Sequence, residues 1–377
     1  MCDCQFRYER RPALLHMTRR AAFALGVMGL VSFARTARLG TALGASTSSA
    51  SLPGIAFIDT HVHFQGRGPG QRRGDYAGAA DVAQLAMRET GIVRSLVMPP
   101  PFPDGLPQTY DFEEFLAVVR GRARAFAFLG GGGSLNPMIH AAAKAGRVGA
   151  TLEARFEARA LEILAAGAVG FGEMSCEHLS FFDRHPYESA PPDHPLFLKL
   201  ADIAAQKDVP IDLHMEAVPQ DMPTPERFRR ISPQNPPTLR ANIDRFRKLL
   251  AANRRARIIW SHVGWDNTGA RSVELCRDLL AENPNLYMNT KIHPVGGGAN
   301  RLLDDAGRAS PEWIELVSRF PDRFLVASDN FHTAPSVNMR RESGLAGPRR
   351  WVDRLPPDLA RKVAIENAQG LYKLHEI

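Results

Sequence analysis

The sequence predicts an α/β fold in which eight parallel strands close into a barrel, each strand being followed by a helix. After residue 54, apolar segments of strand length recur along the chain, and they are rich in β-branched or bulky residues. They cover residues 54–64, 92–100, 124–133, 168–174, 209–217, 256–264, 285–294 and 324–331. Strand–helix alternation is typical of a parallel sheet. Eight such units in roughly 320 residues suit a single (β/α)8 TIM barrel, which needs about 250 residues plus insertions. We therefore expect one barrel domain over residues 51–377, with an open doubly wound sheet as the alternative.

Three stretches have the apolar periodicity of amphipathic helices. Residues 151–168 place apolar side chains on one face and Glu and Arg on the other. Residues 237–253 start with Pro237–Thr238 and repeat apolar residues at Leu239, Ile243, Phe246 and Leu250. Residues 357–374 form the expected last helix.

The loops indicate which end of the barrel carries the site. Long segments rich in proline, histidine and arginine follow the fourth and fifth predicted strands, at residues 175–195 and 217–237. The connections from helices back to strands are short, as at residues 207–210 and 319–323. Barrels of this kind build their sites from the loops at the carboxyl ends of the strands, so we expect the site there.

The first 50 residues differ in charge from the rest of the chain. They contain seven arginines against Asp3 and Glu9, a net charge of +5, which leaves only +2 of the total +7 for the remaining residues. The net charge of the chain after residue 50 therefore does not indicate nucleic-acid binding. Arg19 and Arg20 precede an apolar run over residues 21–34, which is about as long as a signal-peptide core and too short to span a bilayer comfortably.

Paired arginines before such a run resemble a twin-arginine (Tat) export signal. Residues 1–50 are thus expected to be an export signal and linker, which would place the mature protein in the periplasm with no stable membrane span. Ala22 departs from the usual Tat pattern, and Met17 is a second candidate start. An uncleaved anchor or a basic tail is the alternative, and a non-functional signal would leave the protein in the cytoplasm. The oligomeric state stays open, a homo-oligomer included.

Four cysteines are too few for a disulfide scaffold. Cys2 and Cys4 lie in the predicted signal, and Cys176 and Cys276 are about a hundred residues apart. No CxxC pair is present, which excludes a structural zinc ribbon. We expect Cys176 and Cys276 to be buried free thiols, with one disulfide as the alternative.

Polar side chains stand at the carboxyl ends of five of the eight predicted strands. They are His61, His63, Glu173, His214, His262 and Asp329. Each alone has an ordinary explanation, since a strand-end histidine is usually a hydrogen-bonded structural residue and an aspartate after a strand is usually a turn or cap. Six at one end of one type of element are better explained by a metal centre. Four histidines with two carboxylates suit zinc, manganese or iron rather than calcium.

At this point the chain resembles a known family. The "HVH" at 61–63, single histidines after the fifth and sixth strands and an aspartate after the eighth are similar to the amidohydrolase superfamily. The closest resemblance is to its amidohydrolase 2 branch of TIM-barrel metal-dependent hydrolases. The closing "AIENAQGLYKL" at 364–374 resembles the final helix of that branch, and the resemblance covers Ile55–Leu374.

The resemblance implies roles for individual residues. His61, His63 and His214 would bind metal, and Asp329 would be both a ligand and the general base. His262 would bind a second ion, or would remain without metal and polarise the substrate. "GFGEM" at 170–174 is similar to a Gly-Glu segment whose glutamate binds metal, so Glu173 either bridges two ions or supports a site with one. Zinc is the expected ion, with manganese or iron as alternatives.

Several further residues are candidates to line the pocket. Lys291 and His293 end the seventh strand, where they would bind a substrate carboxylate or pair with a neighbouring acid. Trp265 would stack on a substrate ring or belong to the core. The "GGGGSLNP" run at 130–137 would admit substrate close to the backbone or bind an anion. Asp59, two residues before His61, is expected to orient a metal ligand.

These features predict a metal-dependent hydrolase that uses metal-activated water on a small-molecule amide, ester or lactone. Two alternatives remain open at this stage. Some members of the resembled branch are decarboxylases of aromatic or conjugated acids, in which His262 would serve as the acid. The other alternative is a non-catalytic barrel that binds a small molecule.

Overall fold

The computed structural model describes residues 54–68, 71, 73–101, 109–181, 185–292, 298–337 and 344–374. These residues all belong to one compact unit. The predicted export signal over residues 1–50 and the pocket candidate His293 lie outside the described residues.

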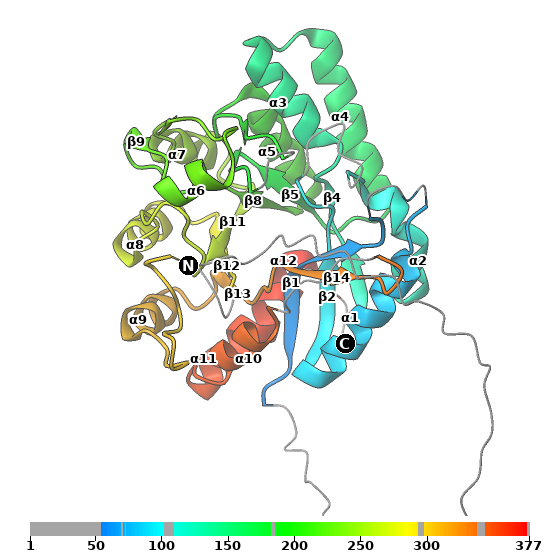
Figure 1. The fold of residues 1–377 in the computed structure, drawn as a ribbon, viewed down its shortest axis with the longest axis vertical. Coiled ribbons are helices and arrows are strands. Elements are labelled where there is room, and N and C mark those ends of the chain that lie inside the picture. The colour runs from blue at the N-terminus through cyan, green and yellow to red at the C-terminus, as the bar shows by residue number, and fades with distance from the viewer. Residues whose placement is uncertain are drawn as a thin grey trace, which may run out of the picture. The chain divides into compact units, whose positions relative to one another are not determined.

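The strands of the barrel fall into two parallel sheets, and each of the eight predicted apolar segments contains strand residues (Figure 1). One sheet has the order β14-β1-β2-β3, and the other has the order β13-β12-β11-β8-β5-β4. The bounds are β1 (Phe57–Gln65), β2 (Ile92–Val97), β3 (Phe126–Phe128), β4 (Gly130–Gly131), β5 (Phe171–Ser175), β8 (Pro210–His214), β11 (Arg257–Val263), β12 (Leu286–Thr290), β13 (Phe324–Leu325) and β14 (Asn330–Thr333).

The two sheets join into a closed barrel because two passes of the chain belong to both. Only Leu129 separates β3 from β4, and its N–H still donates to Val97 of β2 at 2.9 Å. On the other side, β1 bonds to the segment between β13 and β14: Thr60 donates to the carbonyl of Val326, and Asp329 donates to the carbonyl of His61, both at 2.9 Å. Eight parallel passes within the described residues thus close on themselves, as the sequence predicts.

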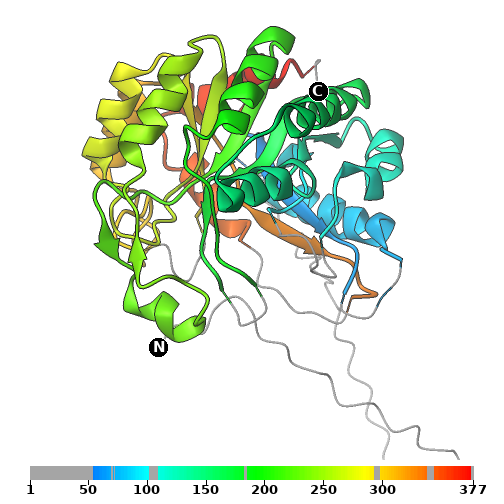
Figure 2. The same ribbon diagram turned by 90° about the horizontal axis from the view of Figure 1, so that it is seen from above.

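Helices surround the strands on the outside of the barrel (Figures 1 and 2). Their bounds are α1 (Tyr76–Thr90), α2 (Leu116–Gly121), α3 (Leu135–Ala145), α4 (Ala150–Ala165), α5 (Pro195–Lys207), α6 (Glu226–Ile231), α7 (Ile243–Ala252), α8 (Val273–Glu282), α9 (Pro311–Arg319), α10 (Ala346–Val352), α11 (Pro357–Arg361) and α12 (Asn367–Tyr372). A 3₁₀ turn, η1 (Phe112–Glu114), precedes α2, and a π-helical segment, η2 (Lys362–Glu366), joins α11 to α12.

Local sequence explains how the first helix is bounded. The Asp75 carboxylate accepts from the N–H of Gly78 at 2.8 Å, which satisfies a donor that the helix leaves unpaired. Gly91 ends α1 with a φ of 76°, in the left-handed region that glycine adopts without steric cost. Between these ends, Tyr76, Ala83 and Met87 turn a buried face to the barrel.

The predicted helix over residues 237–253 begins later than expected. Thr238–Leu239 form a short strand, β10, which pairs antiparallel with β9 (Met222–Pro223), and the helix starts only at Ile243. Leu239 is buried in a satellite cluster with Phe228 and Val218, so its apolar side chain packs within this loop region. The prediction that the helix includes Leu239 was therefore wrong, because this residue pairs with β9 in a hairpin.

The long loops predicted after the fourth and fifth strands have internal structure. The first contains an antiparallel hairpin of β6 (Glu177–His178) and β7 (Glu188–Ser189). The second contains β9, α6 and β10. Asn235 connects the two loops, since its side chain exchanges hydrogen bonds with the backbone of Ser180 at 2.7 and 2.8 Å. They form one packed wall above the carboxyl ends of β5 and β8.

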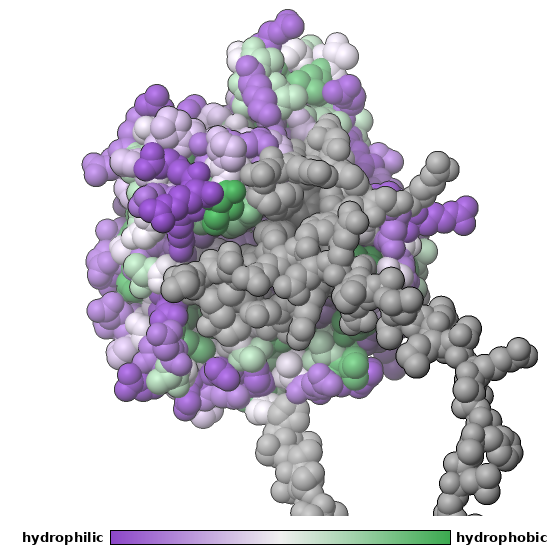
Figure 3. Space-filling view, viewed as in Figure 1, coloured by the Kyte–Doolittle hydropathy of each residue, from purple (hydrophilic) through white to green (hydrophobic). Residues whose placement is uncertain are grey.

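The described surface is largely polar on one face (Figure 3), and the described thiols are buried. Figure 3 shows that the described surface on this face is largely hydrophilic, with hydrophobic residues in small separate groups. Both described cysteines, Cys176 and Cys276, are free and buried, which confirms the expectation for these thiols. None of the described helices combines the length and the apolar character that a membrane crossing requires.

The glycine run at 130–137 packs against backbone. A Cβ at Gly132 would lie 2.3 Å from the carbonyl oxygen of Pro99, and one at Gly133 would lie 1.9 Å from that of Tyr110. Both contacts are too short for any side chain. The run therefore lets two neighbouring segments approach the barrel closely, and no anion is needed to explain it.

Gly133→Ala should destabilise the protein by about 1–3 kcal/mol, because the added methyl group forces the Tyr110 segment away. The urea midpoint, followed by circular dichroism at constant m-value, would measure this loss. Gly121→Ala, at the end of α2 with nothing within 4 Å of its Cβ, is the matched control. It should leave stability unchanged or raise it by about 0.4–1 kcal/mol. Equal midpoints for the two variants would contradict the proposed packing role of Gly133.

Candidate metal centre

Four of the predicted ligands meet at the carboxyl end of the barrel. His61 and His63 are on β1, Glu173 is on β5, and Asp329 lies between β13 and β14. The Nε2 atoms of the two histidines are 3.2 Å apart, and Asp329 Oδ1 is 3.1 Å from Nε2 of His63. Glu173 Oε2 lies 3.4 Å from Nε2 of His61 and 3.3 Å from Nε2 of His63. Potential ligand atoms of all four residues lie within 4.8 Å of one another.

The other two predicted ligands meet the opposite oxygen of the same glutamate. Glu173 Oε1 lies 2.9 Å from Nδ1 of His214, on β8, and 3.3 Å from Nε2 of His262, on β11. Glu173, His214 and His262 form a second group with ligand spacing. The Glu173 carboxylate thus stands between two pairs of histidines, one on each oxygen.

The spacing within each group fits a divalent ion. Two ligand atoms that are each about 2.1 Å from an ion, at an angle of 90–110°, are separated by about 3.0–3.4 Å. The distances of 3.1–3.4 Å in the first group and 2.9–3.3 Å in the second are close to such edges, and the 3.7 Å between His61 Nε2 and Asp329 Oδ1 is longer. Nitrogen and carboxylate donors in this ratio suit zinc, manganese or iron. All six predicted metal residues are accounted for by these two groups.

The structure divides the four histidines between the two groups. His214 is not grouped with His61, His63 and Asp329, and is instead grouped with His262 across the Glu173 carboxylate. The reason is its position on β8, beside β5 in the sheet, where His214 pairs in register with Ser175. His262, one strand further along, faces the same oxygen.

Hydrogen-bond acceptors outside the centre hold the imidazole rings of His61 and His63 in place. Nδ1 of His63 is 2.8 Å from the carbonyl oxygen of Met98, which leaves Nε2 facing the centre. Nδ1 of His61 is 3.2 Å from Oδ1 of Asp212. Asp212 is fully buried, and it also accepts from Ser261 Oγ at 2.7 Å and from Asn289 Nδ2 at 2.8 Å. Its position is therefore rigidly defined.

Asp212 is a site residue that sequence reasoning missed. It precedes His214 by two positions, just as Asp59 precedes His61, and this repeated Asp-x-His spacing was the available signal. Asp59 itself does not contact a ligand ring. Its carboxylate accepts from the N–H and the Oγ of Ser328, at 2.9 and 2.5 Å, and from the N–H of His61 at 3.3 Å. Asp59 therefore fixes the backbone on either side of the site, whereas Asp212 faces a ring.

The two carboxylates of the centre are held in their charged form. Burial alone would raise the pKa of Glu173, but the charge of His61 and hydrogen bonds from His214 and His262 hold it well below its usual range. Burial likewise acts to raise the pKa of Asp329, but the charge of Lys291 and a hydrogen bond with His63 outweigh it, so that this pKa also lies well below its usual range. Both groups are thus ionised at neutral pH, as metal ligands must be.

The pKa values of His214 and His262 are shifted in opposite directions. Burial lowers the pKa of His214, but hydrogen bonds to Glu173 and Glu216 overcome this and raise it to about 9. Burial dominates at His262, where the pKa falls to about 4 despite the nearby carboxylates. His262 is therefore neutral near pH 7, while His214 carries a proton in the metal-free protein.

Lys291 pairs with the acid of the centre. Its Nζ contacts Oδ2 of Asp329 and lies 4.5 Å from the ring centroid of Trp265. The ammonium group is thus held between a carboxylate and an aromatic face. Of the two roles expected for Lys291, the structure places it beside a neighbouring acid, and Trp265 is its partner.

Two aromatic side chains close to the centre were not anticipated. The ring of Phe331 lies 4.4 Å from that of His63, and the ring of His178, on β6, lies 5.1 Å from that of His214. Phe331 is on β14 and His178 is on β6, and neither was among the site residues predicted from the sequence. They give the rim above the centre an aromatic character.

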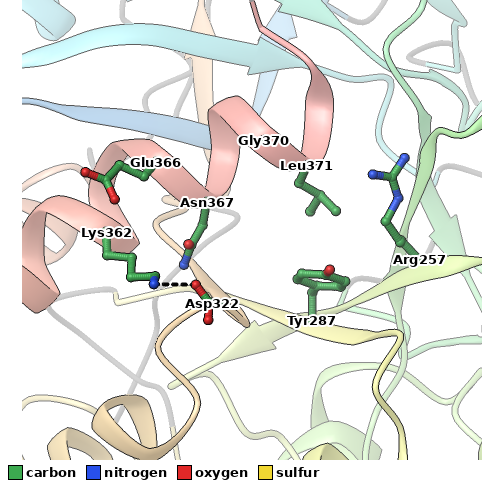
Figure 4. Close-up of a pocket in the computed structure, with 8 residues that line it drawn as sticks. All are labelled: Arg257, Tyr287, Asp322, Lys362, Glu366, Asn367, Gly370 and Leu371. Carbon is green, nitrogen blue, oxygen red and sulfur yellow. Dashed lines mark ion pairs between the residues drawn. The ribbon is translucent and has the colours of Figure 1, made fainter.

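A separate hollow lies at the other end of the barrel strands. Its volume is ≈ 360 Å³. Arg257 and Tyr287 line it near the starts of β11 and β12, and Lys362 and Asp322 pair across it at 2.5 Å (Figure 4). His262 lies at the far end of β11 from this hollow. Sites in barrels of this type form at the carboxyl ends of the strands, so the metal centre, and not this hollow, is the candidate for chemistry.

Comparisons with known proteins return structural likenesses only. No family model matches the chain, and no curated protein matches it. It is similar in structure to a dihydroxybenzoic acid decarboxylase from Polaromonas sp. JS666 with bound manganese, at 14% identity over 85% of this chain and 98% of that one, with a TM-score of 0.46. It is also similar to a probable 2-pyrone-4,6-dicarboxylic acid hydrolase from Acinetobacter baumannii, at 11% identity over 85% and 100% of the two chains, with a TM-score of 0.46.

A further similar structure is amidohydrolase 2 from Bifidobacterium longum subsp. infantis, at 14% identity over 85% of this chain and 99% of that one, with a TM-score of 0.42. These are distant likenesses of shape. They assign neither a reaction nor a substrate to this chain.

Affinity for zinc should increase as the pH rises from 7 to 8.5. The pKa of His214 is about 9 without metal, so an ion that binds Nδ1 must displace a proton throughout this range. Each proton displaced weakens apparent binding by about tenfold per pH unit below that pKa. Competition with a chromogenic chelator on metal-stripped protein would measure the slope, and His214→Asn should reduce it. A zinc affinity independent of pH would show that no such proton is displaced.

Proposed function

We propose that this protein is a metal-dependent hydrolase of the amidohydrolase type that cleaves an amide, ester or lactone bond in a small molecule. The observation that carries the proposal is the position of Glu173, whose two oxygens face two separate pairs of histidines. A carboxylate that supports a single ion needs only one such pair. We propose two divalent ions, zinc in the first instance, with His61, His63 and Asp329 on one side of Glu173 and His214 and His262 on the other.

The chemistry that such ions supply is polarisation of a substrate oxygen and a lower pKa for the attacking water. The other requirements fall on the chain itself. Burial keeps five of the six residues of the centre away from bulk water, and Asp329 is partly buried. Their imidazoles and carboxylates are held in place by Met98, Asp212 and Lys291.

Asp329 is the proposed general base. Oδ1 faces His63, and Oδ2 faces Lys291 and lies 3.8 Å from Nε2 of His262. As the water oxygen bonds to the carbonyl carbon, the carboxylate accepts the proton that the water loses. It then returns this proton to the leaving nitrogen or oxygen as the bond from carbon to the leaving group breaks. Lys291 holds the carboxylate in place between these two steps.

His262 is proposed to act in its neutral form. Its low pKa, about 4, keeps the imidazole uncharged at neutral pH, so that one of its two ring nitrogens has a free lone pair. That nitrogen can therefore bind metal or face the substrate oxygen without first losing a proton. Phe331 and Trp265 supply apolar surface beside the reacting groups, which favours a substrate with a ring or another flat apolar part.

We also propose that the protein is exported to the periplasm. The support is the sequence of residues 1–50, where Arg19 and Arg20 precede a short apolar run. Replacing both arginines by lysine and locating the protein by cell fractionation would test this independently of the enzyme assay.

Asp329→Asn should reduce turnover by at least about a hundredfold, because the amide cannot accept the proton from water. Metal should largely remain, since the histidines and Glu173 are unchanged. Metal content by plasma emission spectrometry and initial rates on the same preparation would separate the two effects. Asp305→Asn, at an exposed aspartate whose ion pair with Arg301 lies at the surface, is the control and should retain normal rates. Near-normal turnover in Asp329→Asn would exclude Asp329 as the base.

The reaction class can be tested on a panel of substrates. Metal-stripped protein would be assayed with aryl esters, lactones, amides and aromatic carboxylic acids, before and after the addition of zinc or manganese. Hydrolysis that depends on added metal supports the proposal. Carbon dioxide release from the acids, with no hydrolysis, would instead establish a decarboxylase. Two ions bound without any turnover would favour a binding protein.

A further inference from the structure

His214 differs from the other three histidines of the centre in the nitrogen that it presents. His61, His63 and His262 each turn Nε2 to Glu173, at 3.4, 3.3 and 3.3 Å. His214 turns Nδ1 to Glu173 instead, at 2.9 Å. Its Nε2 therefore points away from the centre, where Oε1 of Glu216 lies 3.6 Å from it.

Glu216 is itself buried and held in a fixed position. Only 3% of the residue is exposed, and Asn267 Nδ2 donates to its Oε1 at 2.6 Å. The amide of Asn267 has one orientation, because its Oδ1 accepts from Arg227 Nη2 at 3.3 Å and its NH₂ group must then face Glu216. Arg227 also donates to the backbone carbonyl of Asn267 at 3.1 Å. A chain of contacts thus runs from α6 through Asn267 and Glu216 to His214.

We propose that Glu216 is a positioning residue for metal binding by His214, an inference that rests on the proposed two-ion centre. A carboxylate facing Nε2 keeps the proton on that nitrogen, so that Nδ1 is the atom left with a free lone pair toward the ion. It also opposes rotation of the ring. Acceptors of this kind orient metal-binding histidines, and their loss costs about 10–100-fold in metal affinity. Nothing in the sequence marks this residue beyond its place two positions after His214.

A neighbouring buried glutamate offers a matched control. Glu177 is 4% exposed, and its carboxylate accepts from Tyr187 Oη at 2.8 Å and from Asn242 Nδ2 at 3.1 Å. Asn242 also donates to the backbone carbonyl of Glu216 at 2.8 Å, so both glutamates share one structural environment. Glu177→Gln therefore removes a buried carboxylate from the same region without removing the group that faces His214.

The experiment compares Glu216→Gln, Glu177→Gln and wild-type full-length protein. Each metal-stripped protein would be titrated with zinc by calorimetry, and with cobalt(II) followed by its visible absorption. We expect two ions in the wild type and in Glu177→Gln, with equal affinities in both. In Glu216→Gln one ion should bind as in the wild type and the other about 10–100-fold more weakly, with an altered cobalt spectrum.

The outcomes separate the inference from the proposed centre. Two ions of unchanged affinity and an unchanged cobalt spectrum in Glu216→Gln would overturn the role of Glu216 and leave the two-ion centre intact. A wild-type protein that binds one ion, with a cobalt spectrum insensitive to His214→Asn, would overturn the two-ion centre and the role of Glu216 together. If Glu216→Gln fails to fold, as judged by circular dichroism, Asn267→Ala takes its place. That variant keeps the carboxylate but releases it, and should weaken the same ion by several-fold, whereas unchanged binding would again overturn the inference.

Discussion

The structure depends on one carboxylate that four imidazoles share. A buried carboxylate without partners costs several kcal/mol in lost hydration, so its oxygens need hydrogen-bond donors or positive charges beside them. Around Glu173, histidines from three strands approach both oxygens at 2.9–3.4 Å. Contacts with Glu173 and Glu216 raise the pKa of His214, whereas burial lowers that of His262. Glu173 is thus the one residue that belongs to both ligand groups and holds them next to each other.

The barrel is what makes this sharing feasible. Glu173 is on β5, and its partners are on β1, β8 and β11, which no single hairpin or helix could bring together. Parallel strands place all their carboxyl ends at one rim, so residues far apart in sequence meet there. Close packing on the β4 side contributes too, because Gly132 lies near the N–H of Glu173 and the carbonyl of Pro99, with no space for a side chain between them. The strands that close the barrel are therefore also the strands that carry the ligands.

Most of the fold and all six residues of the metal centre could be predicted from the sequence. Buried strands leave a local apolar pattern, and the polar residues that end them interrupt it, so His61, Glu173 and Asp329 could be found one strand at a time. Asp212 and Glu216 could not be assigned in this way, because their role depends on which ring nitrogen a neighbouring histidine presents. Leu239 was misread for a similar reason, since its period fits a helix and only its pairing partner in β9 places it in a hairpin.

The two ligand groups are unequal, and this inequality bears on how the centre would work. The first group has four donors, of which two are carboxylates, while the second has two histidines and only a share of Glu173. Closed four-donor sites are typical of ions that are held firmly, whereas three protein donors and an open position are typical of ions that meet substrate. The second group, beside His178 and the loop wall, therefore has the composition expected on the substrate side. With fewer charged donors of its own, it depends more on the exact orientation of each ring. A carboxylate behind His214, as proposed for Glu216, would therefore affect metal binding more than a comparable residue in the first group.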